Sequence, residues 1–175
     1  MMSARLVLTP ISPRQLLALI EGYEGFEECF GTPAARGLRE FLVSEDVSPA
    51  WLAQLRQAEQ QDPWVHGFAV VHADQRLVIG NLGFKGPPDQ GGVVEIAYGI
   101  VPAFQGRGYA TEAARTGIAF AFADARVRIV RAHTLPQANA STRVLEKCGF
   151  AHAGAIDDPE DGWVWRWDLP RPSRS

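Results

Sequence analysis

The sequence predicts a single α+β domain, residues 1–175, built on a mixed and mostly antiparallel sheet. The length of 175 residues suits one domain with one hydrophobic core. The composition, 46% hydrophobic and 21% charged, is that of an ordinary globular chain. Strand-like runs outnumber helical ones, and only the second half holds a strand–helix–strand unit, whose two strands are expected to lie parallel.

The first third of the chain is predicted to hold one strand and two longer helices. Ser12 followed by Pro13 is a helix-start signal, and the apolar residues after it stop before Gly22. Glycines and prolines between residues 22 and 50 interrupt any regular pattern. We therefore expect a strand over 5–9, a helix over 13–21, loops and short helices over 22–50, and a helix over 49–61.

The rest of the chain alternates strands with two further helices. Its strand-like runs are rich in β-branched and aromatic residues and are separated by turn-forming residues. Small and apolar residues at spacings of three and four predict the buried face of the longer helix, at Ala110, Ala113, Ala114, Gly117, Ile118, Ala121 and Phe122. We expect strands over 64–71, 76–84, 93–101, 129–134, 150–156 and 163–169, helices over 107–123 and 141–147, and a loose tail over 170–175.

Charge and cysteine content argue against several classes of protein. The net charge of −3 lacks the basic excess of a nucleic-acid binder. Cys29 and Cys148 are too far apart for a metal motif, and the four histidines are scattered, so no metal site is expected. No apolar run reaches the roughly 18–20 residues of a membrane span, and residues 1–8 do not resemble a signal peptide. A cytoplasmic protein without nucleic-acid or membrane partners is expected.

The most informative segment is residues 101–110, VPAFQGRGYA, where a strand ends, two glycines follow and a helix begins. The first turn of a helix leaves N–H groups unpaired, and the helix dipole makes this end an anion site suited to phosphate. Arg107 can add a charged contact or point to solvent. A nucleotide-binding P-loop would need a lysine after its last glycine, and a dinucleotide motif would need Gly or Ala where Thr111 stands.

These residues carry a family resemblance. QGRGYA at 105–110 resembles the Q/R-x-x-G-x-G/A acetyl-CoA motif of the GNAT superfamily of N-acetyltransferases. EIAY at 95–98 is similar to the E-I-G-Y strand that precedes this motif, and STRVLEKCGF at 141–150 resembles a segment of the ribosomal-protein-alanine (RimJ/RimL) branch. The resemblance covers residues 64–169 and implies a GNAT fold in which the parallel strands 93–101 and 129–134 splay apart around acetyl-CoA.

The resemblance also implies where the co-substrate binds. Its pantetheine would pair with the strand end at Ile100 and Val101, and Asn139 and Ser141 would lie beside the thiol. An asparagine that often stands three residues before this serine is replaced by Ala138, with Asn139 one place later. The pyrophosphate would rest on the amides of Gln105, Gly106, Arg107, Gly108, Tyr109 and Ala110.

Acetyl transfer to an amine needs a neutral nucleophile, and Glu95 is the best candidate for the base. On strand alternation Glu95 shares a face with Ala97 and Gly99, whose small side chains leave room for a substrate. The alternative is an exposed glutamate or a structural ion pair. Ser141 is the candidate that hydrogen-bonds the leaving thiolate, although Asn139 or Ser141 could instead cap the helix.

Other residues near the expected site have both a functional and a structural interpretation. His133 ends a central strand and could face the cleft or be structural. Trp163, Trp165 and Trp167 alternate on one strand face, which favours core packing over an acceptor wall. The acidic residues at 157–161 favour a solvated turn, although they could attract a cationic acceptor.

We expect an N-acetyltransferase that joins acetyl-CoA to a protein N-terminus or a small amine through a ternary complex, as a monomer or homodimer. The alternatives are a catalytically silent CoA-binding module and a nucleotide-phosphate enzyme of another class. The resemblance favours the first, because a silent module has no need of Glu95 and Ser141.

Overall fold

The structure, a computed structural model, describes residues 1–42 and 48–173 and holds a 7-stranded sheet in the order β1-β2-β3-β4-β5-β7-β6. The strands are β1 (Leu6–Pro10), β2 (Phe68–His72), β3 (Leu77–Phe84), β4 (Val93–Ile100), β5 (Ile129–Thr134), β6 (Ala151–Asp158) and β7 (Gly162–Pro170). In this sheet β4 and β5 run parallel and the other neighbouring strands are antiparallel. The predicted α+β fold with a central parallel pair is confirmed.

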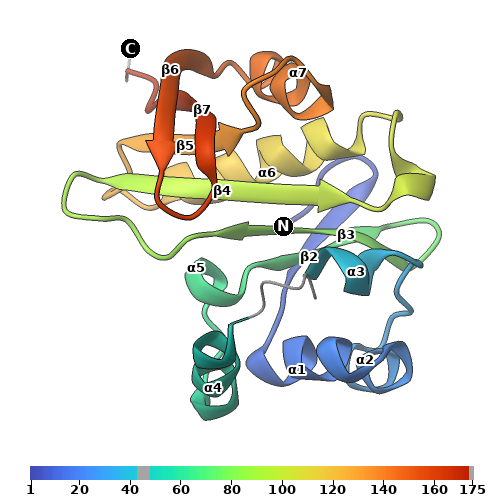
Figure 1. Ribbon diagram of the computed structural model, residues 1–175. Helices are drawn as coiled ribbons and strands as arrows, with labels where there is room; N and C mark the ends of the chain where they lie inside the picture. The colour runs from blue at the N-terminus through green and yellow to red at the C-terminus, as the bar shows by residue number, and fades with distance from the viewer. Residues whose placement is uncertain (43–47, 174–175) are drawn as a thin grey trace.

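Helices cover both faces of the sheet (Figure 1). They are α1 (Pro13–Glu21), α2 (Tyr23–Phe30), α3 (Leu38–Leu42), α4 (Pro49–Gln57), α5 (Pro63–His66), α6 (Tyr109–Ala123), α7 (Ala140–Lys147) and the 3-10 turn η1 (Pro102–Phe104). α6 packs closely on one face, since a Cβ added to Gly117 would lie 2.7 Å from Leu82 Cδ1. α3 lies on the opposite face, where a Cβ added to Gly99 would lie 3.6 Å from Phe41 Cδ1.

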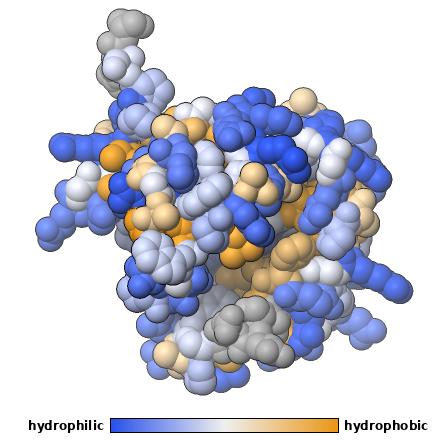
Figure 2. All heavy atoms as spheres, turned by 45° about the horizontal axis from the view of Figure 1, so that its top comes forward, coloured by the Kyte–Doolittle hydropathy of each residue, from blue (hydrophilic) through white to orange (hydrophobic). Residues whose placement is uncertain are grey.

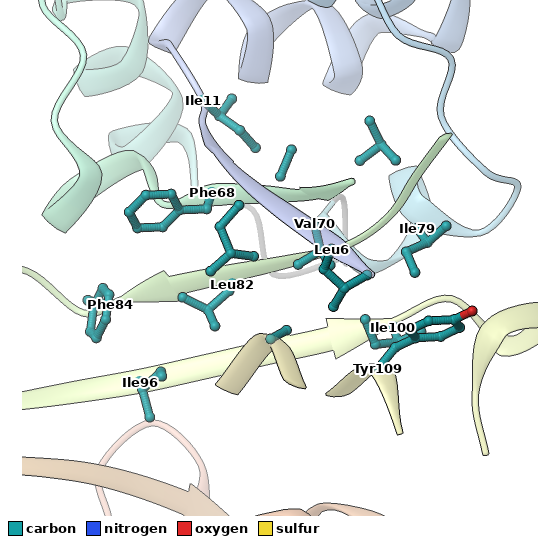
Figure 3. Packing of buried hydrophobic residues seen from close by; sticks show 14 of the residues in the cluster. Leu6, Ile11, Phe68, Val70, Ile79, Leu82, Phe84, Ile96, Ile100 and Tyr109 are labelled. Atoms are coloured by element: carbon teal, nitrogen blue, oxygen red, sulfur yellow. The ribbon is translucent and has the colours of Figure 1, made fainter. Parts of the chain in front are cut away.

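The core between the sheet and α6 follows the predicted patterns. Phe68, Leu82 and Ile96 are at most 3% exposed, and Figure 3 shows them among the packed side chains. On the helix, five of the seven residues predicted to face inward are buried: Ala113, Ala114, Gly117, Ile118 and Ala121. α6 therefore holds a fixed position on β3 and β4, and its N-terminus is fixed relative to the end of β4.

Local signals set several helix ends. At α1, Ser12 accepts a hydrogen bond from the Gln15 amide while the Gln15 side chain accepts from the Ser12 amide, a complete capping box. At α6, Gly108 occupies the N-cap position with φ of +81°, in the left-handed region that glycine adopts without a side-chain clash.

Two expectations were wrong in their boundaries. Residues 64–66 were predicted to begin a strand but belong to α5, because Asp62 caps Trp64 and Gly67, with φ of +72°, ends the turn before β2. The helix predicted over 49–61 ends at Gln57. The region 22–50 contains α2 and α3, in keeping with the short helices expected there, and residues 43–47 of that region lie outside the described residues.

The loose tail predicted over 170–175 is wrong for its first two residues. Pro170 belongs to β7 and pairs with Ile129. The Arg171 guanidinium donates hydrogen bonds to the carbonyls of Phe122 (2.9 Å), Asp124 (2.6 Å) and Val127 (2.8 Å), at the C-terminal end of α6. Residues 174 and 175 lie outside the described residues.

We expect Arg171→Ala to lower the free energy of unfolding by about 2 kcal/mol, because hydrogen bonds from a charged donor to those carbonyls would be lost. Urea denaturation measures this loss. Arg126→Ala is the matched control, since the Arg126 side chain at the same corner pairs, among the described residues, with Asp124 alone and is 67% exposed. Equal unfolding midpoints for the two variants would contradict the role of Arg171.

Candidate acetyl-CoA and amine site

The chain passes from β4 into α6 through a loop whose later amides are unpaired among the described residues. The Gln105 amide, which was expected to bind the pyrophosphate, instead donates to the Pro102 carbonyl (3.2 Å) and is not available. The N–H groups of Gly106 to Thr111 have no hydrogen-bond acceptor within residues 1–42 and 48–173. Gly106 and Gly108 have φ of +75° and +81°, which lets the loop turn its amides in succession toward one region. Unpaired amides at the start of a 15-residue helix form an anion site that fits a diphosphate.

A cavity of about 400 Å³ lies over this loop. Six residues predicted for the co-substrate line it, namely Ile100, Gln105, Gly106, Gly108, Tyr109 and Ala110. α7 closes the other side with Ser141, Arg143 and Lys147, and Phe41 of α3 reaches the rim. Figure 2 shows a hollow on one face of the molecule with apolar atoms at its floor and hydrophilic side chains around it.

Two predicted co-substrate residues, Val101 and Gln105, hold the loop in place. The Val101 amide donates to the Ile79 carbonyl (2.9 Å) and its side chain is buried, so this amide is already paired within the sheet. The Gln105 side chain donates to the Ile100 carbonyl (2.8 Å), which ties the loop to the end of β4. Arg107 is exposed, and its guanidinium lies 5.6 Å from the centre of the Phe104 ring.

Contacts from Arg5, just before β1, and from His72 of β2 fix the start of α6. Arg5 donates to Glu112 (2.8 Å) and to the Arg107 carbonyl (3.0 Å). Burial alone would raise the pKa of Glu112, but hydrogen bonds from Ser3 and Arg5 hold it below its usual value. The buried Tyr109 hydroxyl lies 2.9 Å from the Nε2 atom of His72. These contacts limit movement of the loop amides.

A second cavity, of about 180 Å³, opens where β4 and β5 part. The two strands pair only from Val93 to Glu95 with Ile129 to Arg131, and beyond this point the cavity lies between them. Its lining includes the side chains on the Glu95 face of the sheet and part of α7: Lys85, Glu95, Ala97, His133, Ser141 and Asp161.

Glu95 is held by two neighbours at the base of this opening. Its Oε1 atom lies 2.7 Å from His133 Nδ1 and 3.2 Å from Lys85 Nζ. Burial alone would lower the pKa of Lys85, but the Glu95 carboxylate and nearby acidic residues raise it. The Lys85 ammonium therefore stays charged beside Glu95 at neutral pH, and a cation at this distance favours the ionised form of a carboxylate.

The two cavities share Ser141 and Tyr98 in their linings. Ser141 is exposed in the first turn of α7, whereas Asn139 caps that helix by accepting from the Thr142 amide (3.0 Å) and does not line either cavity. Tyr98 was not predicted. Its buried hydroxyl has no hydrogen-bond partner among the described residues, and burial raises its pKa, so it remains a donor.

A family model described as an acetyltransferase (GNAT) domain matches residues 5–151. This chain belongs to the GNAT acetyltransferases. A curated relative, the uncharacterized N-acetyltransferase YjdG of Bacillus subtilis (strain 168), is 32% identical over 89 residues, and the match spans about half of each chain, 51% in both cases. GNAT enzymes use acetyl-CoA, and the unpaired loop amides fit its diphosphate.

Solved structures share the whole GNAT fold with this chain. RimL, a ribosomal L7/L12 α-N-protein acetyltransferase in complex with coenzyme A, is 15% identical with a TM-score of 0.65, over 96% of this chain and 95% of that one. A spermidine N-acetyltransferase from Vibrio cholerae, in complex with CoA and spermine, is 16% identical with a TM-score of 0.65, over 96% of both chains. The RimJ/RimL-like resemblance of residues 141–150 agrees with such neighbours.

The tryptophans of β7 lie away from the Glu95 face in this GNAT fold. His133 is opposite Arg166 and Ala132 is opposite Trp167 in the β5–β7 register, so the tryptophans share the face of Ala132 rather than that of His133. Trp167 is 4% exposed and donates to Thr134 Oγ1 (3.1 Å), whereas Trp163 is 64% exposed. Core packing, the favoured reading, holds for Trp167 and not for Trp163.

Within residues 1–42 and 48–173, no cluster of three metal-ligating side chains occurs. The same part of the chain has no helix long and apolar enough to cross a bilayer.

Proposed function

We propose that this chain transfers the acetyl group of acetyl-CoA to a primary amine by direct attack within a ternary complex. One observation carries the proposal. The cavity over the unpaired loop amides and the cavity that holds Glu95 meet at Ser141 and Tyr98. A co-substrate bound along the first cavity would thus bring its thioester to the second, where an amine has a carboxylate beside it.

The amine must lose a proton because an ammonium has no lone pair. Lysine amines titrate near 10.4 and α-amines near 7.7–8, so a base is needed more for the former. Glu95 supplies that base at the edge of the second cavity, with Ala97 and Gly99 as its small neighbours on the same strand face. The amine nitrogen bonds to the acetyl carbon, the carbon–sulfur bond breaks, and the amine proton passes to Glu95.

Two hydroxyls stand at the junction where the leaving sulfur would lie. Ser141 was expected to hydrogen-bond the thiolate, and Tyr98 offers a second O–H that is unpaired among the described residues. A hydrogen bond to a charged acceptor is worth about 1.5–3 kcal/mol. Both hydroxyls are therefore suited to stabilise the departing thiolate.

Ser141→Ala and Tyr98→Phe are each expected to lower kcat by about tenfold to a hundredfold, because each removes one of these donors. Tyr98→Phe is also expected to raise the melting temperature, since it removes a buried hydroxyl without a partner. Steady-state kinetics and thermal unfolding measure the two effects. Ser48→Ala is the matched control, because Ser48 only caps α4 and should affect stability but not turnover. Full turnover in both site variants would remove these donors from the mechanism.

The experiment that tests the function measures release of the CoA thiol from acetyl-CoA with a panel of amines. The panel should contain peptides with free N-termini, polyamines and aminoglycosides. Amine-dependent thiol release together with mass spectrometry of an acetylated amine supports an enzyme. Tight CoA binding without turnover for every amine would instead support the silent CoA-binding module.

A further inference from the structure

His133 is unusual among the polar residues of the second cavity, because its two ring nitrogens have opposite surroundings. Nδ1 lies 2.7 Å from Glu95 Oε1. Nε2 is buried and has no hydrogen-bond partner among the described residues. The side chain as a whole is 12% exposed. A buried polar atom left unpaired is costly, so such an atom calls for an explanation.

The contacts assign the donor nitrogen of this histidine. A carboxylate only accepts hydrogen bonds when ionised, so the nitrogen that faces Glu95 must carry the proton. Nδ1 is therefore the donor in this contact, and the buried Nε2 takes no part in it. Because Nε2 is buried, it cannot contact a substrate, and His133 is not itself the group that takes the amine proton.

The position of His133 in the sheet makes the contact specific. Glu95 is the last residue of β4 that pairs with β5, and its partner there is Arg131. His133 lies two residues beyond Arg131 on β5. His133 therefore reaches back across the point where the strands part. Lys85, which follows β3, binds the same Oε1 atom from another direction. Both contacts are made at Oε1, and Oε2 accepts no hydrogen bond from the described residues.

We propose that His133 is a positioning residue that holds Glu95 Oε1 through Nδ1–H, so that Oε2 is the atom that accepts the amine proton. This inference rests on the proposed acetyl transfer. The proton on Nδ1 stays in place during the step. The amine proton moves to Oε2, the nitrogen bonds to the acetyl carbon, and the carbon–sulfur bond breaks to release the CoA thiolate. His133 and Lys85 stabilise the ionised carboxylate before that step and fix its direction.

Other charged groups surround this pair and bear on any pH measurement. Lys85 lies between Glu95 and the β6–β7 turn, with Asp161 4.0 Å from its Nζ atom. On the strand side, Arg166 is opposite His133, and Asp168 pairs with Arg131 at 2.8 Å. The charged groups to be held unchanged in a comparison are Lys85, Arg131, Asp158, Glu160, Asp161, Arg166 and Asp168.

The test compares His133→Phe, which keeps a ring but loses the donor, with His133→Asn, whose amide can donate from nearly the place of Nδ1. His133→Phe should lower kcat by about tenfold to a hundredfold with little change in the KM for acetyl-CoA. The acidic limb of its pH–rate profile should move to higher pH, since a carboxylate without its donor is protonated more readily. His133→Asn should recover most of the rate and return the limb toward its original place.

His152→Phe is the matched control, because His152 is exposed on the edge strand β6 and packs on Trp165 and Trp167. An unchanged rate and acidic limb in His133→Phe would overturn the inference. So would a rate in His133→Asn as low as in a folded His133→Phe, because the ring rather than the donor would then matter. Should His133→Phe not fold, the pH–rate profile of His133→Asn and nitrogen-15 NMR of the imidazole still test the inference.

Nitrogen-15 NMR of the imidazole separates this inference from the proposed function. We expect a proton on Nδ1 of His133, and a changed Nδ1 signal in Glu95→Gln. A proton on Nε2 instead would overturn the inference even in an active enzyme. If no amine is acetylated while Nδ1 carries the proton, the contact stands as a structural one, and both the acetyl transfer and the positioning role of His133 are rejected.

Discussion

Replacing Gly108 by valine is expected to lower the affinity for coenzyme A by about tenfold to a hundredfold, or roughly 1.4–2.8 kcal/mol. Gly108 has φ of +81° at the N-cap of α6, a conformation that a β-branched residue rarely adopts. An added Cβ would also meet Arg5 Nη2 at 3.4 Å. The valine variant must therefore turn its backbone, and the loop amides would no longer point to one region. Isothermal titration calorimetry with coenzyme A measures the loss.

The matched control is Gly31→Val. Gly31 has the same φ of +81° and open space around its Cβ position, but it ends α2 and does not line the cavity over the loop. The same backbone strain should then appear as lower stability in both variants, with weaker CoA binding in Gly108→Val alone. Equal affinities for wild type and Gly108→Val would refute the assignment of this loop to the diphosphate.

The main elements could be predicted because their signals are local. The two glycines before α6 and the small residues at helical spacing along it are visible in the sequence, and the structure uses both. The short helices α2 and α3 were not resolved individually because tertiary contacts define them. Phe26 of α2 is fully buried, and the Tyr23 hydroxyl accepts hydrogen bonds from the amides of Gly37 and Arg39.

The site was only partly predictable for the same reason. Alternation along β4 placed Glu95 beside small residues, but its partners come from other parts of the chain: His133 is 38 residues away and Lys85 precedes β4. The parallel pairing of the two central strands would have placed His133 on the Glu95 face, since Glu95 pairs with Arg131. That the Tyr98 hydroxyl is buried without a hydrogen-bond partner among the described residues could not be predicted, because the pattern of one strand does not show which side chains surround it.

Glu95→Gln is expected to have the largest effect on catalysis, lowering amine-dependent kcat by about 10²- to 10⁴-fold, the usual contribution of a general base. A neutral amide cannot accept the amine proton, and it no longer attracts the Lys85 ammonium. Because Glu95 lines the second cavity and not the one over the loop amides, the affinity for coenzyme A should change little. Stopped-flow or steady-state thiol release, with calorimetry for coenzyme A, measures the two quantities.

The pH dependence gives the sharper form of this prediction. A base must be ionised to act, so the wild-type rate should fall as the pH drops through the ionisation of Glu95, and this acidic limb should be absent from Glu95→Gln. Glu146→Gln is the matched control, because Glu146 is exposed on α7 and lines neither cavity. If Glu95→Gln keeps the wild-type limb, another group takes the proton. The contacts that Glu95 makes with His133 and Lys85 would then have only a structural role, which is to hold β4 and β5 together where their pairing ends.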